Sequence, residues 1–290
     1  MRDVRLPIPL ALTLLCAVVL GNPLTTAAHQ AQAAGRILLA TVMDVTGKTQ
    51  VDFAVDDFLI QEGGDEREVL DVHVADYPIV VLIDDDPSND LGSIKSAVAR
   101  FIARVGERPV AIGTLSAPSE LLASLDDSRD DVVARLATMT AKPGTPSTLP
   151  AVAHAARVLH DTGFPFSAIL VVTGRAIDAR VPVEGDLLPT ITESGATVHI
   201  VESQASRVNA PDGIGSDPVP DLLRVLADQT RGQYTTIFTS ASYGTALDRR
   251  AYKLSAEMMI QYLVPPGEQG GDVRVGVRRP GSRVVGLGVK

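Results

Sequence analysis

Cysteine is almost absent from the sequence: the 290 residues include one, Cys16. It lies in an apolar run near the N-terminus, and Leu15 before it is larger than the small residue that a lipid-anchored export signal places there. A single cysteine cannot form an intramolecular disulfide. The stability of the folded chain must therefore come from its core, which a hydrophobic content of 45% can supply.

Clusters of basic residues are also absent. The chain carries 26 Lys and Arg against 35 Asp and Glu, a formal net charge of -9 at pH 7. Nucleic-acid binding needs a basic patch that neutralises phosphates, so this composition argues against a nucleic-acid partner. A local basic excess occurs only in the C-terminal third, where an acidic protein or a cell-envelope polymer could dock.

Long apolar stretches occur only at the N-terminus. The chain begins with the short basic segment MRDVR, continues with the apolar run LPIPLALTLLCAVVLG, and then has small residues around Ala31-Gln32-Ala33. This order is typical of a cleaved secretory signal, and the run is shorter than the ~20 residues of a membrane span. We expect residues 1–33 to be a signal peptide, with a membrane anchor as the weaker alternative. The protein would then be exported, to the periplasm or out of the cell, with no membrane span left.

The common enzyme signatures are missing as well. The sequence has no G-x-S-x-G, no H-E-x-x-H and no G-x-x-x-x-G-K-[ST] motif. His154 and His160 are six residues apart on one expected helix, a spacing that does not pair them as zinc ligands. We expect these two and His73 to be structural, and His199 to be a hydrogen-bonded core or edge residue. The protein is predicted not to be an enzyme.

Three zones beyond the signal differ in their hydrophobic pattern. Residues 34–77 and 258–290 contain short runs of alternating polar and apolar residues broken by Gly and Pro, the pattern of hairpin-connected strands. In residues 78–257, continuous apolar runs alternate with segments of helical periodicity. This order predicts an α/β domain with a mostly parallel central sheet and helices on both faces.

Two helix ends are marked in the sequence. Ser128 and Asp131 have the spacing of a capping box at the start of one helix. Gly232 follows the helical segment PDLLRVLADQTR, and we expect it at the C′ position, where glycine commonly ends a helix.

Polar residues gather where the expected parallel strands end. Asp84, Asp85 and Asp86 follow one strand, Thr148 begins a helix, and Gly174 follows another strand. Ligands of open α/β sheets bind at the carboxyl ends of the strands, so we expect these positions to meet. Adjacent carboxylates at a buried strand end must be solvated or paired, and a bound cation is the simplest relief.

Several motifs resemble those of a von Willebrand factor type A domain, and specifically of the secreted bacterial proteins described as von Willebrand factor A-related. The resemblance covers residues 36–290 and rests on VMDVTGKTQVDFAVDDFLIQEGG near the start, on LADQTRGQY, and on MMIQYLVPP and DVRVGVRRPG in the tail. It implies a doubly wound α/β domain over residues 78–257. The N-terminal (34–77) and C-terminal (258–290) β segments would pack together as a small accessory β unit.

The resemblance also implies a metal-ion-dependent adhesion site, in which D-x-S-x-S after the first strand is joined by a Thr and by an Asp after the fourth strand. Here Asp84 and Ser88 match the outer positions of that motif, whereas Asp86 replaces its central Ser. Thr148 matches the Thr position, with Thr145 as the competing choice.

The Asp expected after the fourth strand is missing: Gly174 stands there, followed by Arg175. In one interpretation, Asp86 offsets the loss and Mg²⁺ or Mn²⁺ still binds to hard oxygen ligands. In the other, the site has lost its metal, Arg175 neutralises the acidic cluster, and one or two aspartates cap the helix that begins near Ser93 or face water. We favour the second interpretation, which predicts weak or absent binding of Mg²⁺.

The predicted function is that of an exported, non-enzymatic interaction or adhesion module. It would bind an unknown protein or cell-envelope ligand at the carboxyl edge of the sheet, through a degenerate metal site. A metal-independent scaffold that uses the terminal β unit is the alternative, and a metal-assisted hydrolase is a less favoured one.

Overall fold

The computed structural model describes residues 34–144, 147–174, 185, 187–204, 221–265 and 271–289. The expected signal peptide and the residues Thr145 and Arg175 lie outside the described residues. Among the helices that are described, none is long and apolar enough to cross a membrane.

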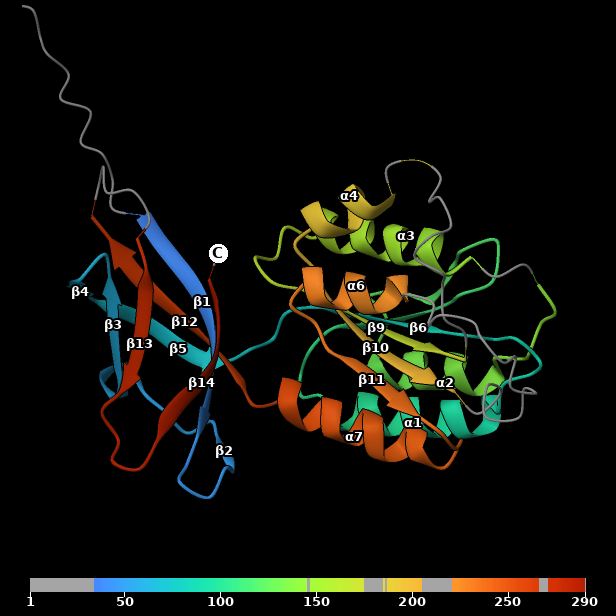
Figure 1. Ribbon diagram of the computed structural model, residues 1–290, viewed down its shortest axis with the longest axis horizontal. Coiled ribbons are helices and arrows are strands. Elements are labelled where there is room, and N and C mark those ends of the chain that lie inside the picture. The colour runs from blue at the N-terminus through green and yellow to red at the C-terminus, as the bar shows by residue number, and fades with distance from the viewer. Residues whose placement is uncertain are drawn as a thin grey trace, which may run out of the picture. The chain divides into compact units, whose positions relative to one another are not determined.

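A six-stranded sheet lies at the centre of the α/β part of the chain (Figure 1). In their order across the sheet, its strands are β11 (Tyr234–Ile237), β10 (Thr197–Ser203), β9 (Ala168–Thr173), β6 (Ile79–Ile83), β7 (Val110–Thr114) and β8 (Leu121–Ala123). The pairs from β11 to β7 are parallel, and β8 joins β7 in antiparallel fashion. The α/β class predicted from the apolar runs is confirmed, and the sheet is mixed because of its antiparallel strand β8.

Helices lie on both faces of this sheet (Figure 1). One face is covered by α1 (Leu91–Arg104), α2 (Arg129–Thr138) and α7 (Ser242–Leu254). The other face is covered by α3 (Thr148–Asp161), α4 (Leu187–Glu193) and α6 (Leu222–Gln229).

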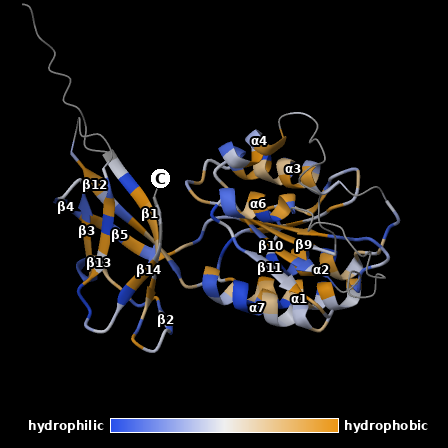
Figure 2. Ribbon diagram, in the orientation of Figure 1, coloured by the Kyte–Doolittle hydropathy of each residue, from blue (hydrophilic) through white to orange (hydrophobic). Residues whose placement is uncertain are grey.

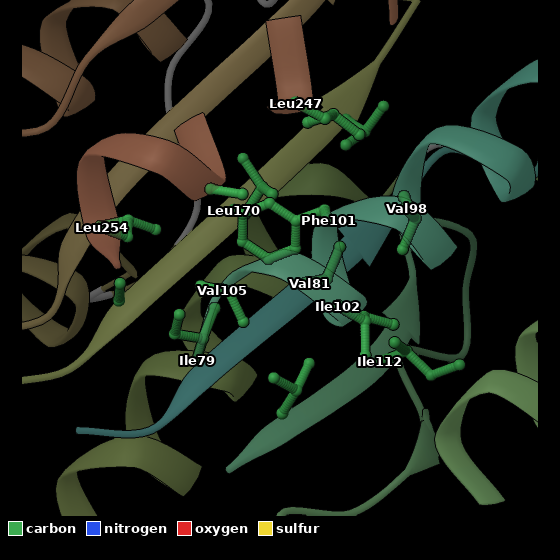
Figure 3. Close-up of a cluster of buried hydrophobic side chains, with 14 of the residues drawn as sticks. Ile79, Val81, Val98, Phe101, Ile102, Val105, Ile112, Leu170, Leu247 and Leu254 are labelled. Carbon is green, nitrogen blue, oxygen red and sulfur yellow. The ribbon is translucent and has the colours of Figure 1, made fainter. Parts of the chain in front are cut away.

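The strand β6 divides the core in two, because successive residues of a strand point to opposite faces. Ile79 and Val81 pack with α1, α2 and α7, whereas Val80 and Leu82 pack with α3, α4 and α6. Figure 3 shows part of the first core, around Phe101. A strand covered on both faces needs a continuous apolar run, and β9 has one as well (Figure 2).

Two helix ends can be compared with the sequence rules. α2 begins at the predicted Ser128 cap: the Asp131 N–H donates to the Ser128 hydroxyl at 3.2 Å, and the Asp131 carboxylate accepts from that hydroxyl at 2.6 Å, where a full capping box would have it accept from the Ser128 N–H. The end of α6 differs. Arg231, with a φ of 58°, takes the C′ position, and Gly232 follows it. The predicted position of Gly232 is therefore wrong by one residue.

Gly232 lies one residue later than predicted because its role is to allow a close contact between the end of α6 and β10, not to adopt the left-handed turn. The N–H of Gly232 donates to the Ala227 carbonyl at 2.7 Å and that of Arg231 to the Asp228 carbonyl at 3.2 Å, the two bonds of a Schellman motif. A Cβ at position 232 would lie well within 3.0 Å of the Val198 carbonyl oxygen in β10. The glycine allows the end of α6 to approach β10, and the left-handed turn falls to the arginine.

The two ends of the described chain form antiparallel sheets of their own. One has the order β14 (Arg283–Val289), β1 (Ala34–Met43), β12 (Glu257–Val264) and β5 (Val69–Val74), with β2 (Thr49–Gln50) paired to β1. The other has the order β13 (Val273–Val277), β3 (Phe58–Glu62) and β4 (Asp65–Arg67), and the short helix η1 (Val55–Asp57) precedes β3. β1 lies between β12 and β14, so residues from both ends of the chain share one sheet. Leu38, Ile60 and Ile260 belong to a core between the two sheets.

Candidate functional site

The order of strands along the chain reverses beside β6: β7 and β8 follow on one side, and β9, β10 and β11 on the other. Such a reversal is where open α/β sheets bind ligands, at the carboxyl ends of the strands. The ends of β6 and β9 lie together, since Ile83 pairs with Val172 and the Asp84 N–H donates to the Val172 carbonyl at 2.9 Å. The loop that begins with Asp84 therefore starts at this edge.

Asp84 is buried at this edge, with 6% of its surface exposed. Its Oδ2 accepts hydrogen bonds from the Thr173 hydroxyl and from the Gly174 N–H, each at 3.2 Å. Its Oδ1 accepts from the Asp86 N–H at 3.3 Å. Both oxygens of this buried carboxylate are thus held by uncharged donors of the chain itself.

Asp86 and Ser88 form a local turn on the exposed side of the loop. One oxygen of Asp86 accepts from the Ser88 N–H at 2.9 Å and from the Ser88 hydroxyl at 2.5 Å. The Ser88 hydroxyl, which the family pattern would direct at a metal, therefore donates a hydrogen bond to the neighbouring carboxylate.

Asp85 points to the other side and was not among the predicted site residues. It is buried, its carboxylate accepts from the Ser116 hydroxyl after β7, and its carbonyl accepts from the Lys142 N–H at 2.9 Å. The two buried carboxylates therefore tie the loop after β6 to the ends of both neighbouring strands.

The helix after this loop is capped by Asp90, and not by Asp84, Asp85 or Asp86 as one interpretation of the sequence expected. The Asp90 carboxylate accepts from the Ser93 N–H at 3.1 Å and from the Ser93 hydroxyl at 2.7 Å. These hydrogen bonds hold the pKa of Asp90 below its ordinary value. The cap falls on Asp90 because it directly precedes the first residue of α1, whereas the three aspartates directly follow β6.

Thr148 is the first residue of α3 and is buried. The Ser147 N–H before it donates to the Leu115 carbonyl at 2.8 Å, which anchors the start of α3 to the end of β7. Within the part of the chain that is described, no hydrogen bond joins Thr148 to Asp84. The hydrogen-bonded group at the edge therefore unites Asp84, Asp86, Ser88 and Gly174, without Thr148.

Asn89 is a further residue of this site that the sequence analysis did not single out. A Cβ built on Gly174 would lie well inside 3.0 Å of the Asn89 Oδ1, a separation that real Cβ atoms essentially never show. The Asn89 Nδ2 is buried and has no hydrogen-bond acceptor among the described residues. Its position directly after the D-x-D-x-S stretch was the available signal in the sequence.

The residues present do not fit the divalent ion that the resemblance implies. The described residues contain no group of three or more His, Cys, Asp or Glu side chains placed to hold a metal. Mg²⁺ needs several oxygen ligands directed at one point. Here both oxygens of Asp84 accept hydrogen bonds from protein donors, Ser88 donates to Asp86, and Gly174 contributes an N–H in place of a carboxylate.

A hollow of about 270 Å³ lies beside Asp85 at the same edge. Its other lining residues are Thr114, Leu122, Arg135, Thr138, Met139, Thr140 and Lys142. The Arg135 guanidinium donates to the Leu122 carbonyl at 3.0 Å and lies 3.5 Å from the Asp127 carboxylate. The hollow is thus bordered by the Asp85 side chain, by two cationic side chains, of which Arg135 is paired with Asp127, and by several threonines, an arrangement suited to a polar group.

A second hollow, of about 450 Å³, lies at the amino ends of the parallel strands. Its lining includes Tyr77 and Phe166 before β6 and β9, His199 in β10, and Gly286 and Gly288 on β14. The two glycines are two residues apart on one strand, so they leave the same face without side chains. Nothing in the sequence patterns indicated this hollow.

His199 fulfils its predicted role as a hydrogen-bonded core residue. It is buried, and its Nδ1 accepts from the Gln233 N–H at 3.1 Å. Burial, together with the positive charges of Arg250 and Lys253, lowers the pKa of His199 well below 6.5.

Comparison with solved structures identifies the fold. The sequence matches no protein-family model and no curated protein. The solved structure of a von Willebrand factor type A protein from Catenulispora acidiphila is 14% identical, with a TM-score of 0.50 over 90% of this chain and 74% of that one. BatB from Bacteroides thetaiotaomicron is 17% identical over 62% of this chain and 98% of its own, with a TM-score of 0.42.

A further match is proximal thread matrix protein 1 from the mussel byssus, in a structure with a zinc-occupied MIDAS motif. It is 14% identical over 63% of this chain and 48% of its own, with a TM-score of 0.47. Together with the parallel sheet and its flanking helices, the Catenulispora match defines the class: the chain has a von Willebrand factor type A fold.

Proposed function

We propose that the protein is an exported, non-enzymatic interaction module of the von Willebrand factor A type. Its ligand-binding surface is the carboxyl edge of a doubly wound sheet, at a degenerate metal-ion-dependent adhesion site. The observation that carries this proposal is the pair of buried carboxylates, Asp84 and Asp85, which fasten the loop after β6 to the end of β9 and to the loop after β7. Loops fastened in this way present a rigid surface, and preorganised surfaces lose little entropy when they bind.

The organisation of the chain follows from the same proposal. Residues 1–33 direct export to the periplasm or the cell exterior, and 78–257 form the binding domain. The segments 34–77 and 258–290 form an accessory β unit, supported by the pairing of β1 with β12 and β14. The ligand is a protein or cell-envelope polymer with acidic groups, which the side chains of Arg135 and Lys142 favour by charge.

The proposal is tested by reversing charge at the edge and, as a matched control, on the accessory unit. Lys142→Glu changes a residue that lines the hollow beside Asp85, and Arg274→Glu changes an exposed residue of β13 whose side chain is 79% exposed. Wild-type and variant proteins would be compared for cross-linking to a cell-envelope fraction. We expect the specific cross-link to be lost in Lys142→Glu and kept in Arg274→Glu. The opposite pattern would contradict the proposal.

The alternative, an interaction scaffold that uses the accessory unit, is favoured by a separate observation. Leu70 and Val74 of β5 and Val285 of β14 are exposed apolar residues on the two outer strands of one sheet. Unpaired outer strands with apolar side chains are sites where another chain can add a strand. Loss of the cross-link in Val74→Lys, with full retention in Lys142→Glu, would support this alternative.

The metal-assisted hydrolase makes a different prediction. If the acidic cluster were catalytic, the protein would turn over generic ester, phosphate or peptide substrates, and Asp84→Ala would abolish that turnover. For the proposed interaction module we expect no turnover in either protein.

A further inference from the structure

We infer that Asn89 closes the carboxyl edge of the sheet to divalent metal ions. Its side-chain amide occupies the space into which a carboxylate at position 174 would have to project. The von Willebrand factor A pattern requires that carboxylate, so Gly174 and Asn89 together replace a metal ligand with an internal contact.

The backbone holds Asn89 in this position from both sides. The Asn89 N–H donates to the Asp86 carbonyl at 3.0 Å, and the Asn89 carbonyl accepts from the Leu91 N–H at 2.9 Å. The residue therefore lies between a fixed turn and the first residue of α1, and its Nδ2 is buried. The Asn89 side-chain amide therefore has its nitrogen buried at the carboxyl edge of the sheet.

The backbone at Gly174 is equally constrained. The Gly174 N–H donates to Asp84 Oδ2 at 3.2 Å, and the preceding residue, Thr173, is fully buried at the end of β9. The direction of any Cβ at 174 is thus set by the sheet, and that direction leads into the Asn89 amide. Both backbone segments are held by hydrogen bonds, and the atoms that a Cβ at 174 meets belong to the Asn89 side chain, so an aspartate at 174 needs that side chain to move away.

The remaining oxygen atoms of the edge are already engaged. An incoming cation would have to compete with the hydrogen bonds that Asp84 accepts from Thr173, Gly174 and Asp86, and with the donation from Ser88 to Asp86. Mg²⁺ also loses its hydration reluctantly, which adds to this cost. Binding of any partner at this edge is therefore independent of metal. The inference concerns coordination alone and holds whether or not the proposed partner-binding function is correct.

The experiment restores the missing ligand with and without Asn89. Purified wild-type protein and the variants Gly174→Asp, Asn89→Ala and Gly174→Asp/Asn89→Ala are stripped with chelator and titrated with Mn²⁺ by isothermal calorimetry. We expect no saturable binding at millimolar Mn²⁺ for the wild type and for Asn89→Ala. The double variant should bind, at least about tenfold more tightly than Gly174→Asp alone, a difference of about 1.4 kcal/mol. Adding Asp84→Ala to the double variant should remove the binding.

Three results would overturn the inference. The first is saturable binding by the wild type that Asp84→Ala removes. The second is equal affinity of Gly174→Asp and the double variant, since Asn89 would then not be the obstacle. The third is a folded double variant that does not bind. Thermal unfolding verifies the fold of each protein; if the alanine double variant does not fold, Gly174→Asp/Asn89→Ser takes its place, and the wild-type titration stands independently of both.

Discussion

At the scale of single residues, Asp84 is the acceptor on which the loops at the carboxyl edge depend. Its replacement by alanine removes the acceptor of the Gly174 N–H and one partner of the buried Thr173 hydroxyl. A buried donor left unsatisfied costs about 1–3 kcal/mol, so we expect Asp84→Ala to lower the free energy of unfolding by about 2–3 kcal/mol. Urea denaturation at neutral pH measures this change.

Asp86→Ala is the matched control for that prediction. Asp86 belongs to the same loop, but its carboxylate accepts hydrogen bonds from the exposed Ser88, whose groups water can satisfy. We expect Asp86→Ala to cost less than about 1 kcal/mol. Equal costs for the two variants would show that the buried carboxylate does not organise the edge.

His199 makes stability depend on pH. Its pKa in the folded protein lies well below the ordinary 6.5, because burial disfavours the charged ring. Between the two pKa values the unfolded chain binds more protons than the folded chain. The free energy of unfolding should therefore fall as the pH drops below 6.5, with a slope of up to about 1.4 kcal/mol per pH unit from this residue.

The contribution of His199 is isolated by comparing urea denaturation of the wild type and His199→Gln from pH 8 to pH 5. Glu257 acts in the opposite sense: burial raises its pKa, so its contribution is lost as the pH rises from 4.5. This contribution is present in both proteins and cancels in the difference. We expect a shallower acid-side loss of stability in His199→Gln and no such change in His160→Gln, at an exposed site of α3. Identical pH profiles in all three proteins would contradict the assignment.

At the scale of elements, the end of α6 shows two adjacent residues with opposite requirements. Arg231 adopts a φ of 58°, which glycine tolerates without cost, so Arg231→Gly should stabilise the protein by about 1 kcal/mol. Gly232→Ala should instead destabilise it by at least about 2 kcal/mol, since the new Cβ meets the Val198 carbonyl. Thermal unfolding of the two variants gives the signs directly; destabilisation by Arg231→Gly would refute this description of the helix end.

Elements with strong periodicity could be predicted from the sequence. The strand Ile79–Ile83 is a continuous apolar run, and a strand buried on both faces needs such a run. Ser128 was recognisable as a cap because a capping box depends on residues three positions apart. Gly232 was misplaced because glycine has two uses, a left-handed turn and a close approach, and local sequence does not separate them.

The contacts of the site are harder to predict, because they join residues that are distant along the chain. The sequence showed that position 174 has a glycine where the family pattern has an aspartate. It did not show that the Asn89 amide occupies the space of that carboxylate, because this contact depends on the pairing of β6 with β9. Likewise, the cap of α1 by Asp90 depends on where the helix starts, and several aspartates in the preceding loop were candidates. The hollow bordered by β14 depends on strand pairing between the two ends of the chain.

At the scale of the whole molecule, a buried arginine links distant segments. Arg108 precedes β7, donates to the Leu254 carbonyl at the end of α7, and lies 3.3 Å from the Glu257 carboxylate at the start of β12. Its guanidinium also lies over the Tyr77 ring, 3.9 Å from the centroid, and the Tyr77 hydroxyl donates to Glu257. The segment that leads into β6 and the segment that begins β12 are therefore joined by one group of polar contacts around Arg108.

Arg108→Met should lower the free energy of unfolding by about 2–3 kcal/mol, because it removes the cation that contacts the Glu257 carboxylate, whose side chain is 23% exposed. The double variant Arg108→Met/Glu257→Met should recover much of that loss, since an apolar pair of similar size removes the uncompensated charge. Urea denaturation of both variants and of Arg274→Ala, as an exposed control, tests the link. A double variant less stable than Arg108→Met would contradict the ion-pair interpretation.

The central claim for the whole molecule is that it has a von Willebrand factor A fold whose carboxyl edge works without metal. The most direct test is thermal unfolding of the wild-type protein, stripped with chelator and then titrated with Mg²⁺, Mn²⁺ and Ca²⁺. An ion that bound the folded state at 100 times its dissociation constant would add about 2.7 kcal/mol and raise the midpoint visibly. We predict no saturable change at millimolar metal. A saturable rise that Asp84→Ala abolishes would contradict the claim and would show that the edge retains a working metal site.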